Sequence, residues 1–173
     1  PGFELGNIGW LTLEGQWQIV NDSTNAHTGN WCLKAEVSTE DSAAARNGYL
    51  VNAYEGEEFV LTAWVKTSDT ITGSVGIRLS WLDASEAEIS VTNSVISSPS
   101  TSYTRLVCSG TAPAGTAYVR AEAVYYSATG TFYVDDFELK RAETHAVTGW
   151  LGGENRVIID SSGLDVGSAG RIK

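Results

Sequence analysis

The chain has 173 residues, of which 18% are charged and 10% are aromatic, and its formal net charge is −10. This length is typical of one domain or of one domain with an appendage. The acidic balance argues against a nucleic-acid or anionic-membrane partner, because both require clustered Lys and Arg. The sequence contains no run of 18 apolar residues and no signal-peptide pattern of charged residues followed by apolar ones, so no membrane insertion is expected. Since the chain starts at Pro1 and has no Met, we expect a segment of a larger protein.

The chain shows almost no helical periodicity and many alternating runs of five to eight residues, separated by Gly, Asn-Gly, Ser-Pro and Ala-Pro. This pattern predicts an all-β fold with regularly spaced strands, as in a sandwich or jelly roll of two antiparallel sheets. In chain order, the predicted strands are residues 17–20, 31–38, 46–52, 58–67, 74–82, 90–96, 104–110, 117–125 and 130–139.

The composition changes after Lys140-Arg141, where the aromatic strands stop. We therefore predict a jelly-roll domain over residues 1–141 and a C-terminal extension over residues 142–173. In the extension, residues 142–153 form a linker, residues 154–159 and 164–166 form short strands, and residues 160–163 form a turn. About thirty residues cannot bury a core of their own. This extension must dock on the sandwich, pair with other chains or lead into a further domain.

Alternation along three strands predicts which side chains face away from the core. If these strands share a sheet, its outer face carries aromatic, basic, acidic and hydroxyl side chains, namely Trp64, Lys66, Arg78, Ser80, Tyr118, Arg120, Glu122 and Tyr126. Such a face suits sugar binding, because rings stack on the apolar side of a pyranose while Arg and carboxylate groups bind its hydroxyls. The alternative is an ordinary solvated sheet, with Arg120 and Glu122 in cross-strand charge pairs and Trp64 covered by a loop.

Five segments in order resemble the β-jelly-roll carbohydrate-binding modules of families four, nine and twenty-two. They are the stretches at residues 2–4, 26–34, 55–66, 111–116 and 130–137, which together cover the chain from Gly2 to about Arg141. The resemblance implies two antiparallel sheets, a structural calcium ion, and a glycan site on the concave sheet or on loops at one rim. Similar modules occur in phage tail proteins, and residues 158–167 look like linker sequence from phage tail fibres.

The resemblance also implies where the calcium ion would bind. Its expected ligands are Glu4, Thr28, Trp31 and Asp136, with Thr28 and Trp31 contributing through the loop carbonyls. Calcium takes six to eight oxygens from carboxylates, backbone carbonyls and water. Thr28 departs from the family pattern, because an acidic side chain is common in that loop. The alternative is that Asp135 and Asp136 cap a β-bulge or a turn without metal.

No catalytic constellation is expected. The two histidines are far apart and have no nucleophile motif nearby, and the acidic residues do not form the pair that a glycosidase needs. Cys32 and Cys108 are either one disulfide or two buried free thiols, of which the thiols are favoured.

These observations predict a non-catalytic glycan-binding module of a larger adhesive protein, located in a virion tail or outside the cell, with a cell-surface or cell-wall polysaccharide as its partner. One alternative is a mainly structural segment of a tail fibre, and another is an accessory module of a secreted polysaccharide hydrolase. The stretch 157–173 has too few apolar residues to enclose a core, among them Val157, Ile159, Leu164, Val166 and Ile172, so we expect it to form a homotrimer. The alternative is a disordered linker, because Ser161-Ser162-Gly163 and residues 167–170 are rich in Gly and Ser.

Overall fold

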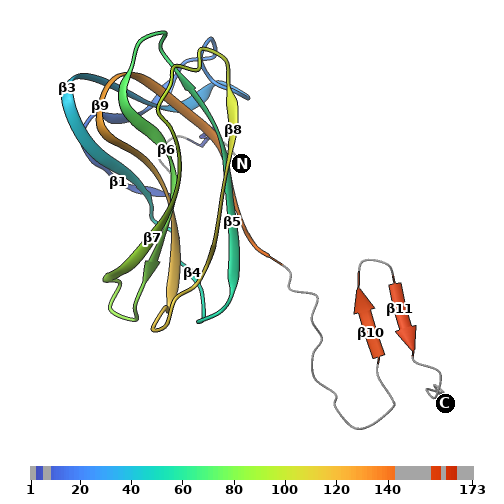
Figure 1. Cartoon of the computed structure of the whole chain (residues 1–173). Coiled ribbons are helices and arrows are strands. Elements are labelled where there is room, and N and C mark those ends of the chain that lie inside the picture. Colours follow the sequence, from blue (N-terminus) through green and yellow to red (C-terminus); the bar gives the residue numbers. More distant parts are fainter. Residues whose placement is uncertain (1–2, 6–8, 143–156, 161–162, 167–173) are drawn as a thin grey trace. The chain divides into compact units, whose positions relative to one another are not determined.

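The computed structural model describes residues 3–5, 9–142, 157–160 and 163–166. The chain divides into two compact units, Pro1–Ala142 and Glu143–Lys173, and each is considered by itself. The first unit contains nine strands, which Figure 1 shows in sequence colours. They are β1 (Trp10–Leu13), β2 (Trp17–Asn21), β3 (Trp31–Asn47), β4 (Val51–Asn52), β5 (Glu58–Thr67), β6 (Thr72–Leu82), β7 (Glu88–Ile96), β8 (Thr104–Thr111) and β9 (Tyr118–Arg141).

The two longest strands pass through both layers of the sandwich. The first part of β3 and the second part of β9 pair with each other, and together with β2, β5 and β8 they form layer A. The second part of β3 and the first part of β9, with β1, β4, β6 and β7, form layer B. The all-β expectation is confirmed. Three of the predicted strands, residues 31–38, 117–125 and 130–139, are parts of the two long strands β3 and β9, whereas the predicted strand 46–52 covers only the end of β3 and the short strand β4.

Both long strands bend where they change layer. The register of β3 against β9 shifts between Val37 and Asp41 and again before Ala43. On β9, the backbone of Ser127 has a φ of 42° and that of Gly130 a φ of 126°. A Cβ at Gly130 would lie 2.8 Å from Cγ2 of Ile71. Gly130 is therefore needed at this corner, both for its backbone conformation and for the close approach of residue 71.

The core lies between the layers and contains the residues that alternation predicts. Phe59, Leu61, Ala63 and Val65 of β5 are buried. Their counterparts across the core, on β6 and β9, are also buried: Ile77, Leu79, Trp81, Val119, Ala121 and Ala123. The rings of Phe59 and Trp81 meet edge to face with centroids 6.0 Å apart, which joins layer A to layer B.

Both cysteines are free and buried. Cys32 lies in β3 and Cys108 in β8, and the strands β9 and β5 separate them within layer A. Burial raises the pKa of the Cys32 thiol to about 12, and it also raises the pKa of Cys108. A disulfide between them is thus incompatible with the strand order, and the thiols pack as small apolar side chains.

The second unit contains a hairpin of β10 (Val157–Asp160) and β11 (Gly163–Val166). Their antiparallel register places Val157 opposite Val166 and Ile159 opposite Leu164. The sequence predicted strands close to these positions. The predicted linker at residues 142–153, apart from residue 142, and the two central residues of the predicted turn at residues 160–163 lie outside the described residues. Within the described part of the chain, no helix is long and apolar enough to cross a membrane.

Candidate functional site

The outer face of layer B carries a row of polar side chains across its central strands. Strand pairing places Arg46 of β3 opposite Glu122 of β9, Glu122 opposite Arg78 of β6, and Arg78 opposite Asn93 of β7. Arg120 lies two residues before Glu122 and therefore on the same face. We call Arg46, Arg78, Arg120 and Glu122 the Glu122 cluster.

Glu122 is the centre of this cluster and has no exposed surface. Arg78 donates from Nε to Oε2 of Glu122 at 2.6 Å and also pairs with that oxygen through Nη2. Arg120 donates from Nε to the other oxygen, Oε1, at 2.7 Å, and Nε of Arg46 lies 3.7 Å from Oε1. Three guanidinium groups thus surround one buried carboxylate, which is an arrangement that keeps the carboxylate and its partners in fixed positions.

Two further carboxylates lie at the margin of the Glu122 cluster. Glu14 pairs with Nη1 of Arg46, and Oε2 of Glu88 lies 3.7 Å from Nη2 of Arg78. Burial by itself would lower the pKa of Arg78, but the charge and hydrogen bond of Glu122 outweigh it, and the pKa is raised. The arginine therefore stays charged despite being largely buried.

Half-buried tyrosines bracket the Glu122 cluster along β9. Tyr118 lies near one end of the row, opposite Leu82, and Tyr126 lies near the other, opposite Ser74. The hydroxyl of Tyr126 donates to Oδ1 of Asn93 at 2.9 Å and accepts from Nη1 of Arg78 at 3.5 Å. At ~3.3 Å per residue, the eight steps from Tyr118 to Tyr126 span about 26 Å. This face thus combines ring surfaces with fixed hydrogen-bonding groups.

The structure corrects the prediction that Trp64 and Lys66 share this face. Both lie in β5, which pairs with β8 and β9 in layer A, whereas Arg78, Tyr118, Arg120, Glu122 and Tyr126 lie in layer B. The prediction failed because β9 serves both layers, so that two strands paired with β9 need not share one layer. Alternation within their strands also places Leu82 and Val124 on the outward side, yet both are completely buried.

Trp64 is instead covered by the loop before β3. The imidazole of His27 stacks on Trp64 with ring centroids 4.2 Å apart. The ammonium of Lys66 donates to Oδ1 of Asn25 at 2.8 Å and lies over the rings of Tyr103 and Tyr133, at 5.1 and 4.9 Å from their centroids. These contacts hold the loop against layer A and leave Trp64 half-buried.

Three residues of this site were not predicted from the sequence, namely Arg46 beside Glu122, Glu14 beside Arg46 and Asn93 beside Tyr126. Arg46 was placed at the start of a predicted strand but was not assigned to any face. Its pairing with Glu122 depends on the bend of β3, where the register of β3 against β9 shifts. Counting alternate residues along a single strand does not reveal such a shift. Asn93 lies at a polar position of β7, and continuing the alternation argument across to that strand could have identified it.

The four predicted calcium ligands come together around one loop. Oε1 of Glu4 accepts the backbone N–H groups of Asn30 and Trp31 at 2.9 and 3.0 Å. Oδ1 of Asp136 accepts from the Thr28 hydroxyl at 2.8 Å, and Oδ2 lies 2.7 Å from Nδ1 of His27. Both carboxylates therefore border residues 28–31, which is where the resemblance places the ion.

The same residues also form a β-bulge, which was the alternative to calcium. Asp136 has a φ of 50°, the register of β5 against β9 shifts at this point, and buried Asp135 accepts the backbone N–H groups of His27, Thr28 and Asp136. Burial raises the pKa of Asp135. Among the described residues, no three acidic, His or Cys side chains form a metal-like cluster. An ion here would take most of its oxygens from carbonyls and water, which calcium accepts. The calcium site stays a prediction.

Chelation tests the predicted calcium ion. We expect EDTA to lower the melting temperature of the chain, and Asp136→Ala to abolish this sensitivity. An ion that binds only the folded state stabilises it by ~2.7 kcal/mol at a hundredfold excess over its dissociation constant. The measurement is a pair of melting curves with added calcium and with EDTA. Coincident curves for the unmodified chain would rule out a stabilising ion.

Several solved structures share this fold. The chain has a TM-score of 0.59 and 22% identity to the Clostridium thermocellum xylanase 10B structure that contains a CBM22-1 and a GH10 module with xylohexaose, covering 84% of this chain and 29% of that one. It has a TM-score of 0.57 and 19% identity to TmCBM61 in complex with β-1,4-galactotriose, and the match covers 82% of this chain and 94% of that one. The enzymatically active domain of bacteriophage CBA120 tailspike protein 4 has a TM-score of 0.58 and 15% identity to this chain, and the match covers 80% of this chain and 20% of the tailspike chain.

The similarity is thus confined to a small part of the tailspike and xylanase chains, whereas it extends over nearly all of the isolated module. No family model and no curated protein matches the sequence. Family 16 and family 22 modules are also among the similar structures, with TM-scores of 0.54 and 0.58. Together with the two-layered antiparallel arrangement, these likenesses identify the fold of the chain as the jelly roll of carbohydrate-binding modules.

Proposed function

We propose that the chain is a non-catalytic glycan-binding module and that the outer face of layer B binds the glycan. The observation that carries this proposal is the Glu122 cluster, with its buried carboxylate, three guanidinium groups and flanking tyrosines. Arg120 engages Glu122 through Nε, and within the described residues its two terminal nitrogens have no hydrogen-bond partner. They are available to the hydroxyl groups of a sugar.

The geometry suits sugars for two physical reasons. Guanidinium groups held by a carboxylate present donors at fixed angles, and a ligand then loses little further side-chain freedom on binding. Tyr118 and Tyr126 offer ring surfaces to the apolar faces of sugar residues at either end of the row. The solved modules that resemble this chain include one complexed with xylohexaose and one complexed with β-1,4-galactotriose, which supports a polysaccharide as the ligand.

A hydrolytic role is not part of this proposal. Glycoside hydrolysis uses two carboxyl groups across the scissile bond, one of which must be protonated. Glu122 is instead paired with Arg78 and Arg120, and Glu88 lies near Arg78 at the margin. In this proposal both carboxylates hold arginine side chains in place, and neither acts on a glycosidic bond.

We further propose that the module is part of a larger adhesive protein of a phage tail. The likeness to a phage tailspike supports this setting, and it would place the module in a virion tail, exposed to cell-surface or cell-wall polysaccharide. An extracellular polysaccharide hydrolase that carries the module as an accessory is the competing setting, in line with the likeness to the xylanase structure.

The glycan-binding face is tested by removing one guanidinium. A glycan array on the unmodified chain first identifies a ligand, and calorimetry then compares Arg120→Ala with Arg105→Ala. We expect Arg120→Ala to weaken binding by ~1–3 kcal/mol, the range for a truncated contact residue. Arg105 is exposed on β8 in layer A, so its removal serves as the matched control and should leave the affinity unchanged. Equal losses in both variants would contradict the assignment of the face.

A second proposal concerns the C-terminal hairpin, which we propose associates with copies of itself as a homotrimer. Within the described residues, β10 and β11 pair only with each other, over four residues each. An isolated two-stranded hairpin is marginally stable, and its open edges seek further pairing. Three copies would display three modules and multiply weak sugar contacts through avidity.

Sedimentation decides between a trimer and a monomer. The full chain is compared with a chain that ends at Arg141, which retains all nine strands of the first unit. We expect a trimer for the full chain and a monomer for the shorter one. A full chain that sediments as a monomer would refute the association, and a shortened chain that remains a trimer would locate the contact in the jelly roll.

A further inference from the structure

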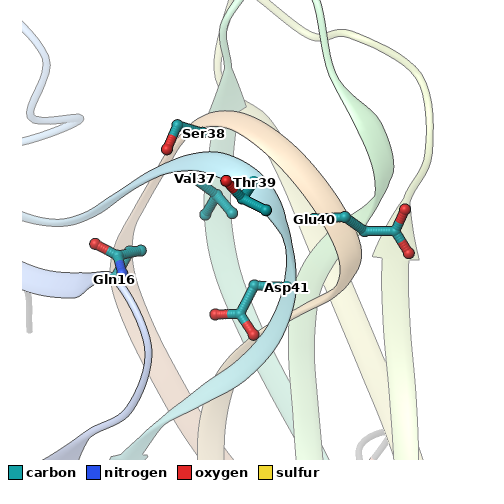
Figure 2. A pocket seen from close by; sticks show the side chains of 6 residues that line it. All are labelled: Gln16, Val37, Ser38, Thr39, Glu40 and Asp41. Atoms are coloured by element: carbon teal, nitrogen blue, oxygen red, sulfur yellow. The ribbon is translucent and has the colours of Figure 1, made fainter.

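A polar hollow lies at the corner where β3 changes layer. Its volume is about 320 Å³, and Figure 2 shows the side chains that line it. They are Gln16, Val37, Ser38, Thr39, Glu40 and Asp41. Five of these six side chains carry hydrogen-bonding groups, and none of the six belongs to the Glu122 cluster. The hollow is therefore a second polar feature, separate from the proposed glycan-binding face.

A buried tyrosine holds the two walls of this hollow in place. The hydroxyl of Tyr125, whose side chain has no exposed surface, donates to Oδ2 of Asp41 at 3.0 Å. The same hydroxyl accepts the backbone N–H of Gln16, also at 3.0 Å. Asp41 lies on the bend of β3, and Gln16 lies just before β2. One fixed hydroxyl thus positions groups from both sides of the hollow.

The residue next to Gln16 fits this arrangement only as glycine. Gly15 has a φ of 59°, which favours glycine, and a Cβ at this position would lie 2.1 Å from the Tyr125 hydroxyl oxygen. The close approach of the backbone brings Gln16 within reach of Tyr125. The backbone of Gln16 and the carboxylate of Asp41 are consequently held in place before any ligand arrives, which lowers the entropic cost of binding.

The hollow continues along the neighbouring strands. A second hollow of about 150 Å³ shares Gln16 and is further lined by Gln18, Val20, Lys34 and Glu36. Lys34 is paired with Glu36 at 2.5 Å, so its charge is balanced locally. Two of the residues around the larger hollow are acidic and none is basic, and of the two carboxylates only that of Asp41 faces the hollow, because that of Glu40 points away from it (Figure 2). An anionic ligand would be repelled there, in a chain that already carries a net charge of −10.

We propose that the larger hollow is a second saccharide site, which binds one neutral sugar residue through its hydroxyl groups. Its volume falls at the lower end of the range for small-molecule sites. The amide of Gln16 and the hydroxyls of Ser38 and Thr39 can donate or accept, and the free oxygen of Asp41 accepts. No ring lines the hollow, so recognition depends on hydrogen bonds. This site does not require that the Glu122 cluster bind a glycan.

Two neighbouring carboxylates provide a matched test. Figure 2 shows the carboxylate of Glu40 pointing away from Gln16 and Asp41. Asp41→Asn and Glu40→Gln each remove one negative charge with little change in shape, and Asn keeps an acceptor for Tyr125. Only Asp41→Asn removes a charge-assisted acceptor from the hollow, and we expect it to weaken binding about fivefold or more, whereas Glu40→Gln should bind as the unmodified chain does.

The measurement is amide NMR of the full chain during titration with D-galactose, D-glucose, D-xylose and D-mannose, each added separately. We expect at least one of these sugars to shift the amide signals of Gln16 and residues 38–41 in a saturable way. The shifts should persist in Arg120→Ala, because Arg120 is not among the residues that line the hollow. If none of the four sugars moves these signals, or if Asp41→Asn and Glu40→Gln bind equally, the second site is refuted, whatever the outcome at the Glu122 cluster.

Discussion

Replacing Glu122 with Gln is expected to lower the free energy of unfolding by ~3–5 kcal/mol, because removal of one partner from a buried ion pair leaves the other charges without compensation. The effect is large here since Arg78 and Arg120 both donate to the single carboxylate, and Arg46 lies close by. Urea unfolding followed by tryptophan fluorescence measures the change.

Glu88→Gln is the appropriate control for this substitution. Its carboxylate is 44% exposed and lies 3.7 Å from Arg78, and exposed ion pairs contribute only ~0–1 kcal/mol. Unchanged stability of Glu122→Gln would mean that the arginines are satisfied without the carboxylate charge. In that case the Glu122 cluster would not be a preorganised site, and the proposed function would lose its principal support.

Replacing Trp81 with Ala is expected to cost ~3–5 kcal/mol of folding free energy, the range for truncating a buried aromatic side chain. Trp81 is 1% exposed, meets Phe59 of the opposite layer edge to face, and donates from Nε1 to the Thr92 hydroxyl at 3.1 Å. Its removal therefore leaves a cavity between the layers and an unpaired hydroxyl. Thermal or urea unfolding of the variant measures this cost.

Trp64→Ala provides the comparison, because it removes the same side chain from a half-buried position outside the core. It loses the stacking contact with His27 but leaves the packing between layers intact, so we expect a markedly smaller loss of stability. Equal losses for both tryptophans would show that the loop over Trp64 contributes as much to folding as the core does.

Alternation predicted the core well because it depends on a local rule. Successive side chains of a strand point to opposite faces, so Phe59, Leu61 and Ile77 could be assigned to the core without knowledge of the partner strands. The same rule placed Arg78, Arg120 and Glu122 on an outer face. Their contacts with one another follow from the pairing of β6 with β9, which the sequence analysis assumed in placing them on one sheet.

Long-range pairing limited the rest of the prediction. Whether Trp64 faces the same side as Glu122 depends on how β9 is shared between layers, and alternation within a strand carries no information on this. The hollow at the β3 corner was missed for a similar reason. Its walls come from Gln16 and Asp41, and the residue that joins them is Tyr125, more than 80 positions further along the chain.

The path of β9 has a mechanical consequence. The strand is paired on both sides through much of its length and leads directly into the residues after Arg141. A tensile load applied from the C-terminal side therefore acts along β9. Rows of backbone hydrogen bonds to β3, β5 and β6 oppose it, and these bonds must break together in shear instead of one by one. An attachment through this end would hold the module against drag while the proposed glycan-binding face stays folded.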